Sequence, residues 1–552
     1  MTAAPPEPLL AGPPSPLPAL APPAEVTAGY RAQGWWRVET FVDDLYRTAA
    51  RHPGRPALVA ERVHRPADRW ITVSYAQLAR YVTRFAAALA GLGVAAGDPV
   101  AYQLPSWWET AALTLACWRL GAPAVPVPPT VRSHALHRIL GQTRARVCVV
   151  PDVWEGFAHA EALADLAPAL PWLRHRVVVG DAAATGAVDF NRRFLRTPHE
   201  RYPPGRGLGP ARGRPDRTAL LVTVMGLEDS FASVLHTPDT LYAAAGSPSG
   251  AEGGVFHSTL PLTAPAALVH AVCKPLASGG TGVFADVWDP GRCLDLMAGA
   301  GVGQSHGAPE HWREVLSAQR RDPRVLGRLR TVLSGGDGGT PDELRAALGA
   351  ALGAPVLTAW GAPELGYGTV AAGAGAAGPA GPSVVVPSGL ELKAADDPSR
   401  LLARGPSVCL ARWPYQAERP LPTWEHQDGW IDTGTTATGD GGSGVLLVPV
   451  PEVERELLAH PQVREAAVLP YTDSEYGELP CAVVVPSTET APPGLVALRE
   501  HLARRGVAGT LLPTRLELVG SLPYDEHGQV RKEALRAWLE RLRPGTPRPA
   551  PG

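Results

Sequence analysis

Short apolar runs and amphipathic stretches alternate along most of this chain, and the alternation predicts strands and helices in turn. Asp98–Leu104 carries a short apolar run, Trp107–Leu120 places apolar residues three and four positions apart, and Ala122–Pro126 is apolar again. Those spacings predict a strand, a helix and a second strand. The rhythm recurs at four further apolar runs, Leu220–Val224, Gly282–Ala285, Leu329–Leu333 and Val356–Ala359. Repeated strand–helix units predict mostly parallel sheets covered by helices, which is the α/β fold class.

Two glycine-rich stretches interrupt this pattern. Ala371–Gly381 is predicted to be a loop. Its Gly-x-Gly-x-x-Gly spacing is not expected to bind a dinucleotide, because a proline and no helical pattern follow it. Thr438–Gly444 is predicted to be a flexible hinge between a large and a small domain.

The chain is therefore expected to have two domains and two tails. Residues 1–30 are rich in proline and alanine and are predicted to be disordered, as are residues 543–552. The large N-terminal domain is expected over residues 31–437 and a small, mobile α+β domain over residues 438–542. In the small domain the patterns predict strands at Glu465–Leu469 and Ala482–Val485, and helices at Val453–His460, Leu495–Arg505 and Lys532–Leu542.

Composition narrows the class of protein. The 552 residues are 45% hydrophobic and 19% charged with a net charge of −2, which favours a folded protein with no preference for nucleic acid or membranes. The six cysteines lie far apart without a Cys-x-x-Cys pair, so we expect reduced thiols in a cytoplasmic protein and no metal site. The three lysines are Lys274, Lys393 and Lys532, and none follows a glycine, which excludes a Walker-type phosphate loop.

Six sequence blocks, in order, resemble the adenylate-forming (ANL) superfamily of acyl-CoA ligases, peptide-synthetase adenylation domains and luciferases. The blocks are Gln103–Ala122, Val234–Leu241, Trp360–Glu364, Gly429–Thr435, Gln462–Glu478 and Ser521–Glu533. The resemblance implies a large N-terminal domain, a small mobile C-terminal domain and two half-reactions. In the first half-reaction ATP and an acid give an acyl-adenylate. In the second, the adenylate and CoA give a thioester and AMP.

Two departures from the family affect the first half-reaction. The family's phosphate loop, Thr-Ser-Gly-Thr-Thr-Gly-x-Pro-Lys-Gly, aligns with Val224–Ser233, where Ala232 replaces the lysine and Glu228 and Asp229 add negative charge. Like charges in a partly dry site repel strongly, which opposes phosphate binding. Gln529 stands where the family has the lysine that bridges the substrate carboxylate and the α-phosphate. The resemblance therefore predicts a damaged adenylation step.

The second half-reaction needs a site for AMP, and the resemblance assigns residues to it. The candidates are Gly336, Asp337, Trp360, Glu364, Thr435 and Asp440. Asp337 would accept a hydrogen bond from adenine, Trp360 would stack on adenine, and Glu364 aligns with the carboxylate that binds Mg²⁺ in the family. The ribose ligand is either Thr435, which replaces the family's aspartate, or Asp440. Trp360 as a core aromatic, and Glu364 and Asp440 as turn residues, remain alternatives, and the need for Mg²⁺ stays open.

The acyl pocket is expected in the segments that align with the family's pocket. Its candidate residues are Thr263, Ala264, Gly307, Ala308, Ser334 and Gly335. Such small residues leave volume for a bulky apolar acid, of which a polycyclic terpenoid acid is one candidate. His306 is a candidate catalytic residue that would contact the acyl carbonyl, with a purely structural histidine as the alternative. Glu364 and Gln529 complete the catalytic candidates.

Our first expectation is an acyl-CoA ligase that does not adenylate. It would take a preformed acyl-adenylate and CoA and release acyl-CoA and AMP, so a separate adenylating ligase would supply the adenylate. Two alternatives stay open: a pseudoenzyme that binds an acid or adenylate, and a complete ATP-dependent ligase in which Arg531 or Lys532 replaces the lost lysine. The chain is shorter than the family between Asp440 and Glu452, so the route of CoA is not predicted.

Overall fold

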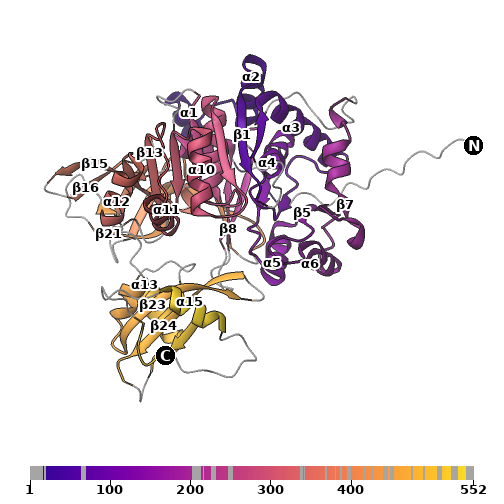
Figure 1. Cartoon of the computed structure of the whole chain (residues 1–552). Helices are drawn as coiled ribbons and strands as arrows, with labels where there is room; N and C mark the ends of the chain where they lie inside the picture. The colour runs from indigo at the N-terminus through magenta and orange to yellow at the C-terminus, as the bar shows by residue number, and fades with distance from the viewer. Residues whose placement is uncertain are drawn as a thin grey trace, which may run out of the picture.

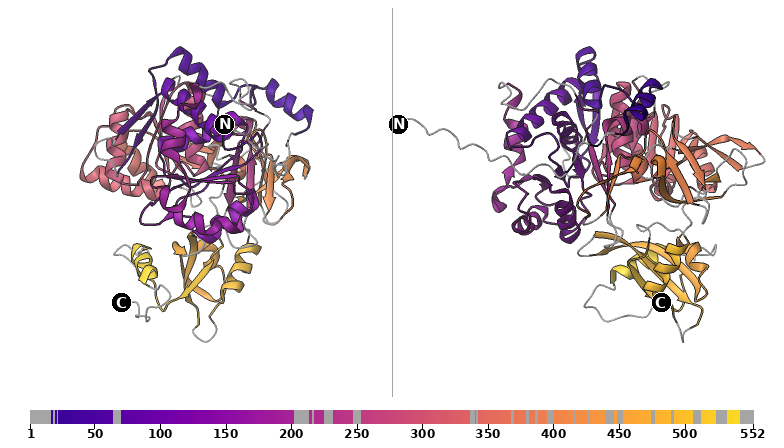
Figure 2. Two further views of the ribbon diagram at one scale, coloured as in Figure 1. Left: turned by 90° about the vertical axis from the view of Figure 1, so that its right-hand side faces the viewer. Right: turned by 180° about the vertical axis from the view of Figure 1, so that it is seen from behind.

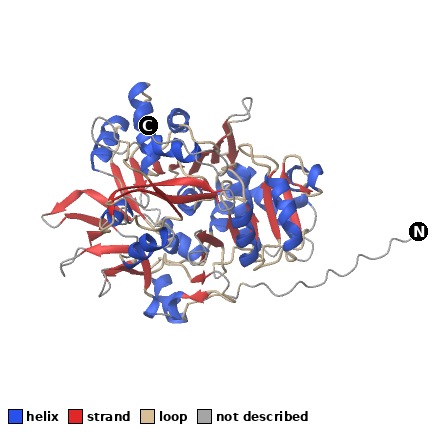
Figure 3. Cartoon of the chain, turned by 90° about the horizontal axis from the view of Figure 1, so that it is seen from below, coloured by secondary structure: helices blue, strands red, loops and turns tan. Residues whose placement is uncertain are grey.

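The fold is built on two nine-stranded sheets that share a hydrophobic core (Figure 1). The computed structural model describes residues 17, 20, 22–63, 70–201, 213–215, 217–224, 232–246, 253–335, 340, 342–366, 370–378, 381–385, 388–394, 400–414, 417–425, 427–438, 446–447, 453–473, 477–488, 492–505, 512–523 and 532–541. Helices and strands are interspersed throughout this part of the chain, as Figure 3 shows by colour. The α/β fold class predicted from the repeated strand–helix units is confirmed.

The first sheet has six parallel strands in its centre and antiparallel strands at both edges. Its order is β16 (Gly381–Val385), β15 (Val370–Gly378), β14 (Val356–Trp360), β13 (Thr331–Gly335), β12 (Gln304–Gly307), β10 (Val255–Ser258), β11 (Thr281–Ala285), β1 (Pro56–Glu61) and β2 (Trp70–Ser74). Strands β14 to β1 in this order are parallel to their neighbours. The carboxyl ends of these strands therefore meet at one edge of the sheet.

The second sheet also has a parallel centre. Its order is β20 (Leu421–Pro422), β19 (Ala411–Pro414), β9 (Ala232–His236), β8 (Leu220–Val224), β4 (Ala124–Pro126), β3 (Val100–Tyr102), β5 (Val147–Pro151), β6 (His175–Val179) and β7 (Val188–Asp189). Strands β8 and β9 are antiparallel, with Val224 opposite Ala232. Residues 225–231, which connect them, lie outside the described residues and include Glu228 and Asp229.

Helices pack on both faces of the sheets. They are α1 (Ala24–Ala32), α2 (Phe41–Arg51), α3 (Tyr75–Ala90), α4 (Trp108–Leu120), α5 (Ser133–Thr143), α6 (His159–Leu166), α7 (Pro238–Ala245), α8 (Pro265–Leu268), α9 (Lys274–Ser278), α10 (Pro290–Ala300), α11 (Pro309–Arg321) and α12 (Asp342–Leu352). Helix α4 is buried on every side from Trp108 to Trp118, because it belongs to the core that the two sheets share. Caps define several helix starts: Thr237 accepts from the backbone of Thr240 at the start of α7, and Pro238 follows it.

The predicted N-terminal tail extends less far than residue 30. Helix α1 begins at Ala24, and Leu17 and Leu20 are buried in a hydrophobic cluster with Trp36 on the second sheet. Burial of these leucines offsets the cost of ordering the chain, which the proline-rich composition alone does not show. The other residues before Ala24 are described only at positions 22 and 23.

A four-stranded sheet follows the first nine-stranded sheet in the chain. Its strands are β17 (Glu391–Ala394), β18 (Arg400–Arg404), β21 (Ile431–Thr438) and β22 (Leu446–Leu447). Because β22 pairs with the end of β21, this sheet extends past residue 437, where the sequence predicts the domain boundary. Of the predicted hinge Thr438–Gly444, Thr438 ends β21 and residues 439–444 lie outside the described residues.

The C-terminal residues form a small α+β unit. It contains the sheet β23 (Val463–Asp473), β24 (Gly477–Pro486) and β25 (Arg515–Leu518), with helices α13 (Val453–Leu458), α14 (Leu495–Arg504) and α15 (Lys532–Arg541). This unit lies below the large domain in Figures 1 and 2. Each strand and helix predicted in this region is present, and strands β23 and β24 are longer than predicted because they pair over their whole length.

The prediction of a loop over Ala371–Gly381 was wrong. Most of this stretch lies in β15, and Gly381 begins β16. Strand β15 pairs with β14 on one side and with β16 on the other. Pairing on both sides outweighs the low strand propensity of glycine and alanine. A strand in place of the helix that a dinucleotide fingerprint requires agrees with the rejection of that motif.

Among the helices of the described ranges, none has the length and apolar character needed to cross a membrane.

Candidate active site

The predicted acyl-pocket residues come from neighbouring parallel strands of the first sheet. His306 and Gly307 end β12, Ser334 and Gly335 end β13, and Thr263 lies in the segment after β10. The register places Gly307 beside Ser334, and His306 next to the last residue of β10. Since carboxyl ends of parallel strands meet at one edge, and ligands bind at such edges, the structure brings these segments together where a ligand site is expected.

Several nucleotide-site candidates cannot be placed by their side chains. Gly336, Asp337, Asp440 and Gln529 lie outside the described residues. The backbone of Trp360 ends β14 and that of Thr435 lies in β21, but their side chains are not among those described. The contacts assigned to these residues stay predictions.

The small pocket residues have different local roles. Thr263 is 3% exposed, and its hydroxyl has no hydrogen-bond partner. Ala264 and Ala308 are the N-caps of α8 and α11, and a proline follows each. The Ser334 hydroxyl accepts a hydrogen bond from Thr340 Oγ1 at 2.7 Å, so it already has a structural partner.

The two pocket glycines are required by packing. A Cβ atom on Gly307 would lie 2.3 Å from Thr259 Oγ1 and 3.1 Å from the Trp312 ring. A Cβ atom on Gly335 would lie 2.4 Å from the Ala359 carbonyl oxygen. These close approaches to neighbouring elements account for glycine at both positions. The volume that the sequence assigned to them as space for the acyl group is therefore used by the protein itself.

His306 lies in a buried polar cluster on the inner face of the first sheet. Its ring stacks on His270, with centroids 4.4 Å apart and planes at 16°. Burial lowers the pKa of His306 to about 4, with the charge of Lys274 as a second cause, and it lowers the pKa of His270 well below its usual range. Both rings are therefore neutral at pH 7. Nδ1 of His306 is buried without a hydrogen-bond partner.

His270 belongs to a π-helical turn, η7 (Val269–Cys273), between α8 and α9. Pro275, two residues beyond the turn, has no N–H to bond the carbonyl of Ala271 in the helical manner. That carbonyl approaches β11, where a Cβ atom on Gly282 would lie 1.9 Å from its oxygen. Pro275 and Gly282 thus favour the wider turn. Single π-turns of this kind occur frequently at functional sites.

Glu364 lies in the short helix η8 (Pro363–Leu365) after β14. Its carboxylate is 12% exposed and forms an ion pair with Arg412 of β19 at 3.4 Å. The backbone around it is fixed: Cys409 N–H donates to the Glu364 carbonyl at 2.6 Å, and His236 Nε2 donates to the Pro363 carbonyl at 2.7 Å. Burial lowers the pKa of His236 to about 4, so this ring is neutral.

The described residues around Glu364 do not fit a divalent cation. Magnesium prefers several oxygen ligands, usually with more than one carboxylate or phosphate. Glu364 already has a guanidinium beside it, and no group of three or more His, Cys, Asp or Glu side chains able to hold a metal occurs in the described ranges. The side chains around Glu364 therefore do not support the prediction that this residue binds Mg²⁺.

Sequence reasoning missed His270, Lys274 and Arg412. Lys274 carried one signal, because it is one of three lysines in the chain. Arg412 is 48 positions from Glu364 and belongs to the other nine-stranded sheet, so only the folded chain brings the two together. His270 follows the candidate pocket residues Thr263 and Ala264 in the sequence. Pro275 was a sequence signal for the irregular helical turn that contains His270.

Two family models match this chain. The model described as AMP-binding enzyme matches residues 45–221 and 232–408, and the model described as AMP-binding enzyme C-terminal domain matches residues 452–529. The second match begins after β22.

Curated relatives match over nearly the full length. The chain is 24% identical to the medium-chain fatty-acid–CoA ligase of Escherichia coli (strain K12), over 92% of this chain and 92% of that protein. It is 28% identical to the 2-hydroxy-7-methoxy-5-methyl-1-naphthoate–CoA ligase of Streptomyces carzinostaticus, over 94% of this chain and 97% of that protein.

Solved structures agree on the fold. The apo structure of Mycobacterium smegmatis MbtA has a TM-score of 0.63 at 24% identity, covering 94% of this chain and 98% of that one. The anthranilate CoA ligase AuaEII, in complex with anthranoyl-AMP, also has a TM-score of 0.63, at 20% identity, covering 91% of this chain and 97% of that one. With family models matched over both domains, the chain belongs to the AMP-binding enzymes, the adenylate-forming superfamily that includes the acyl-CoA ligases.

Proposed function

We propose that this protein is a non-adenylating acyl-CoA ligase, which forms a thioester from CoA and a preformed acyl-adenylate. The CoA sulfur attacks the acyl carbonyl carbon, the bond from that carbon to the phosphate oxygen breaks, AMP leaves with the electron pair, and the thiol proton passes to solvent. The observation that carries the proposal is the loss of both family lysines, at Ala232 and Gln529, within an otherwise matching chain.

The family match supports a changed phosphate loop. The AMP-binding model matches on both sides of residues 222–231 and not across them. Glu228 and Asp229 lie within that gap. Carboxylates there would repel the β- and γ-phosphates of ATP. Attack on an adenylate involves no pyrophosphate, so the same substitutions leave the second half-reaction possible.

Loss of the lysine at position 529 acts on the transition state of adenylation. Charge develops on phosphorus only in that transition state, and one missing preorganised donor typically costs on the order of 10²–10³ in rate. A glutamine amide donates hydrogen bonds but carries no charge. An acyl-adenylate is already activated, so thioester formation does not require that charge.

The proposed AMP site keeps the residues assigned from the sequence. Asp337 and Trp360 are proposed to bind adenine, and either Thr435 or Asp440 is proposed to bind the ribose. Glu364 is proposed to act at this site as one member of an ion pair with Arg412.

The acid is proposed to be bulky and largely apolar. The relative from Streptomyces carzinostaticus is by name a ligase of a substituted naphthoate. This chain also resembles the non-adenylating acyl-CoA ligase of platensimycin and platencin biosynthesis, whose acid is a polycyclic terpenoid, and we take that class as the first candidate. A separate adenylating ligase is proposed as the source of the adenylate. A cytoplasmic location is proposed because all six cysteines are free thiols.

An assay of thioester formation tests this function. Bulky acids are offered with CoA either as free acid plus ATP and Mg²⁺ or as preformed acyl-adenylate, and products are identified by mass spectrometry. Thioester is expected from the adenylate alone, above the rate of spontaneous thiolysis measured without protein. Thioester from both would indicate a complete ligase. Tight adenylate binding without thioester would indicate a binding pseudoenzyme.

Removal of divalent metal is expected to leave thioester formation from the adenylate unchanged. The Arg412 guanidinium already neutralises Glu364, so chelation with excess EDTA removes nothing that the carboxylate needs. The Arg412→Gln variant is expected to be equally insensitive to Mg²⁺ and to EDTA, because one carboxylate does not supply the several oxygen ligands that Mg²⁺ prefers. Arg404→Gln is the matched control, because Arg404 pairs with the exposed Glu391. Stimulation of the unaltered protein by Mg²⁺ would contradict this account.

A further inference from the structure

Lys274 is a half-buried cation that begins α9, after the segment with the candidate pocket residues Thr263 and Ala264. Its ammonium donates to Gln304 Oε1 at 2.7 Å and lies 5.5 Å from the centroid of the Phe256 ring. Gln304 begins β12, and Phe256 is its neighbour in register on β10. Burial lowers the pKa of Lys274 to about 8, so the ammonium form still predominates at pH 7.

Two pairs of side chains, each joining β12 to the helical segment of η7 and α9, lie on one face of the sheet. Side chains two residues apart on a strand share a face, so Gln304 and His306 of β12 both point toward η7 and α9. His270 contacts His306 in the first pair, and Lys274 contacts Gln304 in the second pair. The two pairs are separated along β12 by about 7 Å, which is the rise of two strand residues. The histidine pair is buried and lies toward the carboxyl end of β12, and the half-buried lysine lies beside the first residue of that strand.

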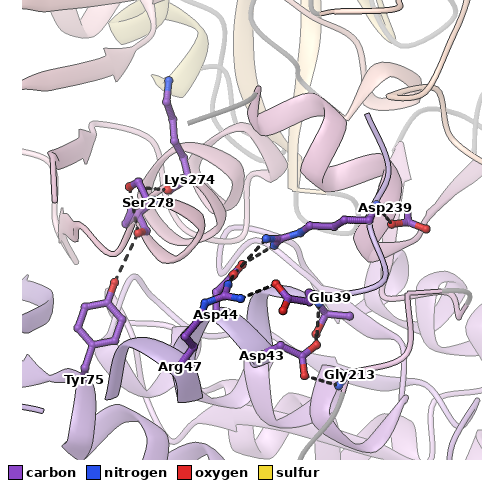
Figure 4. A network of polar contacts seen from close by, with 12 residues as sticks. Glu39, Asp43, Asp44, Arg47, Tyr75, Gly213, Asp239, Lys274 and Ser278 are labelled. Atoms are coloured by element: carbon purple, nitrogen blue, oxygen red, sulfur yellow. Dashed lines mark hydrogen bonds and ion pairs between the residues drawn. The ribbon is translucent and has the colours of Figure 1, made fainter. Parts of the chain in front are cut away.

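Lys274 is without a carboxylate partner among the described residues. The nearby acids seen in Figure 4 are engaged elsewhere: Asp44 pairs with Arg37 and Arg47, and Arg47 also pairs with Glu39. The Lys274 side chain points away from these residues, and its carbonyl oxygen accepts from Ser278 Oγ at 3.0 Å in a separate contact. Lys274 is half-buried and its pKa is lowered by desolvation, so a cation without a counter-ion at this position favours a further hydrogen-bond acceptor beside it.

Two polar atoms of the candidate site residues are buried without a partner. Nδ1 of His306 and Oγ1 of Thr263 have no hydrogen-bond partner, and the two residues are 5% and 3% exposed. Buried polar atoms are nearly always satisfied, so unsatisfied ones at a candidate site indicate a missing partner. Within the described part of the chain, Lys274 uses one of its three donors, in the hydrogen bond to Gln304.

We propose that Lys274 is a specificity-determining residue that binds a second oxygen of the acyl group, remote from the reacting carbonyl. The inference rests on the proposed function, since it assumes that an acyl-adenylate enters this pocket. The ligand chemistry is a hydrogen-bond-accepting oxygen, either a carboxylate or a neutral ketone or ether. The substrate class is thus an oxygenated bulky acid, with its apolar skeleton beside Phe256 and its polar end at Lys274.

Three acyl-adenylates of one bicyclic skeleton test the proposal: one without a further oxygen, one with a distal ketone and one with a distal carboxylate. The unaltered protein is expected to favour an oxygenated compound by at least tenfold in kcat/KM, and by up to about 10⁴-fold if the lysine is left wholly unpaired by the hydrocarbon. Preference for the carboxylate compound would show that the second oxygen of the acyl group belongs to a carboxylate. Equal use of the ketone and the carboxylate compounds would show that this oxygen is neutral.

Lys274→Met is expected to remove this preference, so that the oxygenated and hydrocarbon adenylates are used with similar kcat/KM. Lys393→Met is the matched control, because Lys393 is exposed and lies 4.2 Å from the Trp430 ring. Its preference ratio should equal that of the unaltered protein. Two outcomes would overturn the inference. In the first, the unaltered protein uses the hydrocarbon adenylate with the same kcat/KM as the oxygenated ones. In the second, the Lys274→Met variant keeps the preference ratio of the unaltered protein.

Binding without turnover separates this inference from the proposed function. Calorimetry with non-hydrolysable sulfamoyl-adenosine analogues of the same three acids gives the preference as a ratio of dissociation constants. Preferential binding that Lys274→Met removes, with no thioester from any adenylate, would support the lysine site and contradict the ligase. Thioester from all three adenylates at similar rates and equal binding would support the ligase and contradict the lysine site.

Discussion

The Gln529→Lys variant is expected to form acyl-adenylate and pyrophosphate from ATP and a bulky acid about 10²–10³ times faster than the unaltered chain. The resemblance places this residue at the adenylation lysine, after a glycine and before Val-Arg. A lysine there restores a full positive charge beside the phosphorus as it becomes pentacoordinate. Pyrophosphate release, followed with an enzyme-coupled assay, measures the gain.

A second substitution is expected to add to the first. Ala232 begins β9, is half-buried and lies opposite Val224. The two residues therefore lie side by side near the two ends of the stretch that aligns with the family's phosphate loop. Ala232→Lys combined with Gln529→Lys restores both family lysines, and replacing Glu228 and Asp229 by threonine removes the repulsion. Each step should raise the rate with ATP, since phosphate binding and transition-state charge are separate requirements.

The matched control is Gln529→Met, which has similar length and no charge. Both variants at position 529 should form thioester from a supplied adenylate at the rate of the unaltered chain. If the lysine variants release no pyrophosphate while this second activity is retained, the assignment of Gln529 to the family lysine is wrong. A gain with Gln529→Met equal to that with Gln529→Lys would show that charge is not the missing element.

The repeated strand–helix pattern could be predicted because its signals are local. The run Leu220–Val224 is β8 with the predicted bounds, and Trp107–Leu120 is α4 shifted by one residue at its start. Strand ends were less certain, since β13 spans Thr331–Gly335 against the predicted Leu329–Leu333. Hydrophobic spacing identifies an element, whereas its ends depend on capping and pairing partners.

What failed depends on contacts between distant segments. Strand β15 was read as a loop because glycine and alanine have low strand propensity, and its partner β14 is what orders it. The pairing of β22 with β21 across the glycine-rich stretch also does not follow from composition. The error at β15 came from treating composition as decisive where antiparallel pairing supplied the hydrogen bonds.

The candidate site was predictable in outline and not in detail. Parallel strands place His306 and Ser334 at one edge, which follows from topology alone. The partners of these residues do not follow from topology. Arg412 reaches Glu364 from the second nine-stranded sheet, and the glycines of the pocket serve packing. The family resemblance supplied roles for aligned residues and none for Lys274, which aligns with no motif quoted for the family.

Replacing Glu109 by alanine is expected to lower the free energy of unfolding of the large domain by about 3–5 kcal/mol, the usual result of breaking a buried ion pair. Glu109 in α4 pairs with Arg62, which follows β1, and the two residues are 4% and 7% exposed. Without the carboxylate, the buried Arg62 guanidinium loses its charge partner. Its Nε atom already lacks a hydrogen-bond partner, so little compensation is available.

Replacing both members of the pair should be much less damaging. In Arg62→Met combined with Glu109→Leu no charge is left buried, and such replacements are often neutral or stabilising by about 1–4 kcal/mol. The Arg62 guanidinium also lies 4.7 Å from the Trp107 ring, a contact that a methionine partly replaces. Urea denaturation followed by tryptophan fluorescence measures all four members of the double-mutant cycle.

An exposed pair provides the comparison that separates burial from charge. Arg404 and Glu391 pair on the four-stranded sheet with side chains 38% and 56% exposed, and Glu391→Ala should cost only about 0–1 kcal/mol. If Glu109→Ala is equally mild, water reaches Arg62 and the site is not closed. If it is severe and the double replacement restores stability, the pair is retained for a reason other than stability. It lies where β1 of the first sheet meets α4 in the shared core, and there Trp107 Nε1 donates to Asp286 at 3.2 Å. In that case we expect the ion pair to fix the register of the helix against the sheet, because a paired charge specifies one arrangement where an apolar contact allows several.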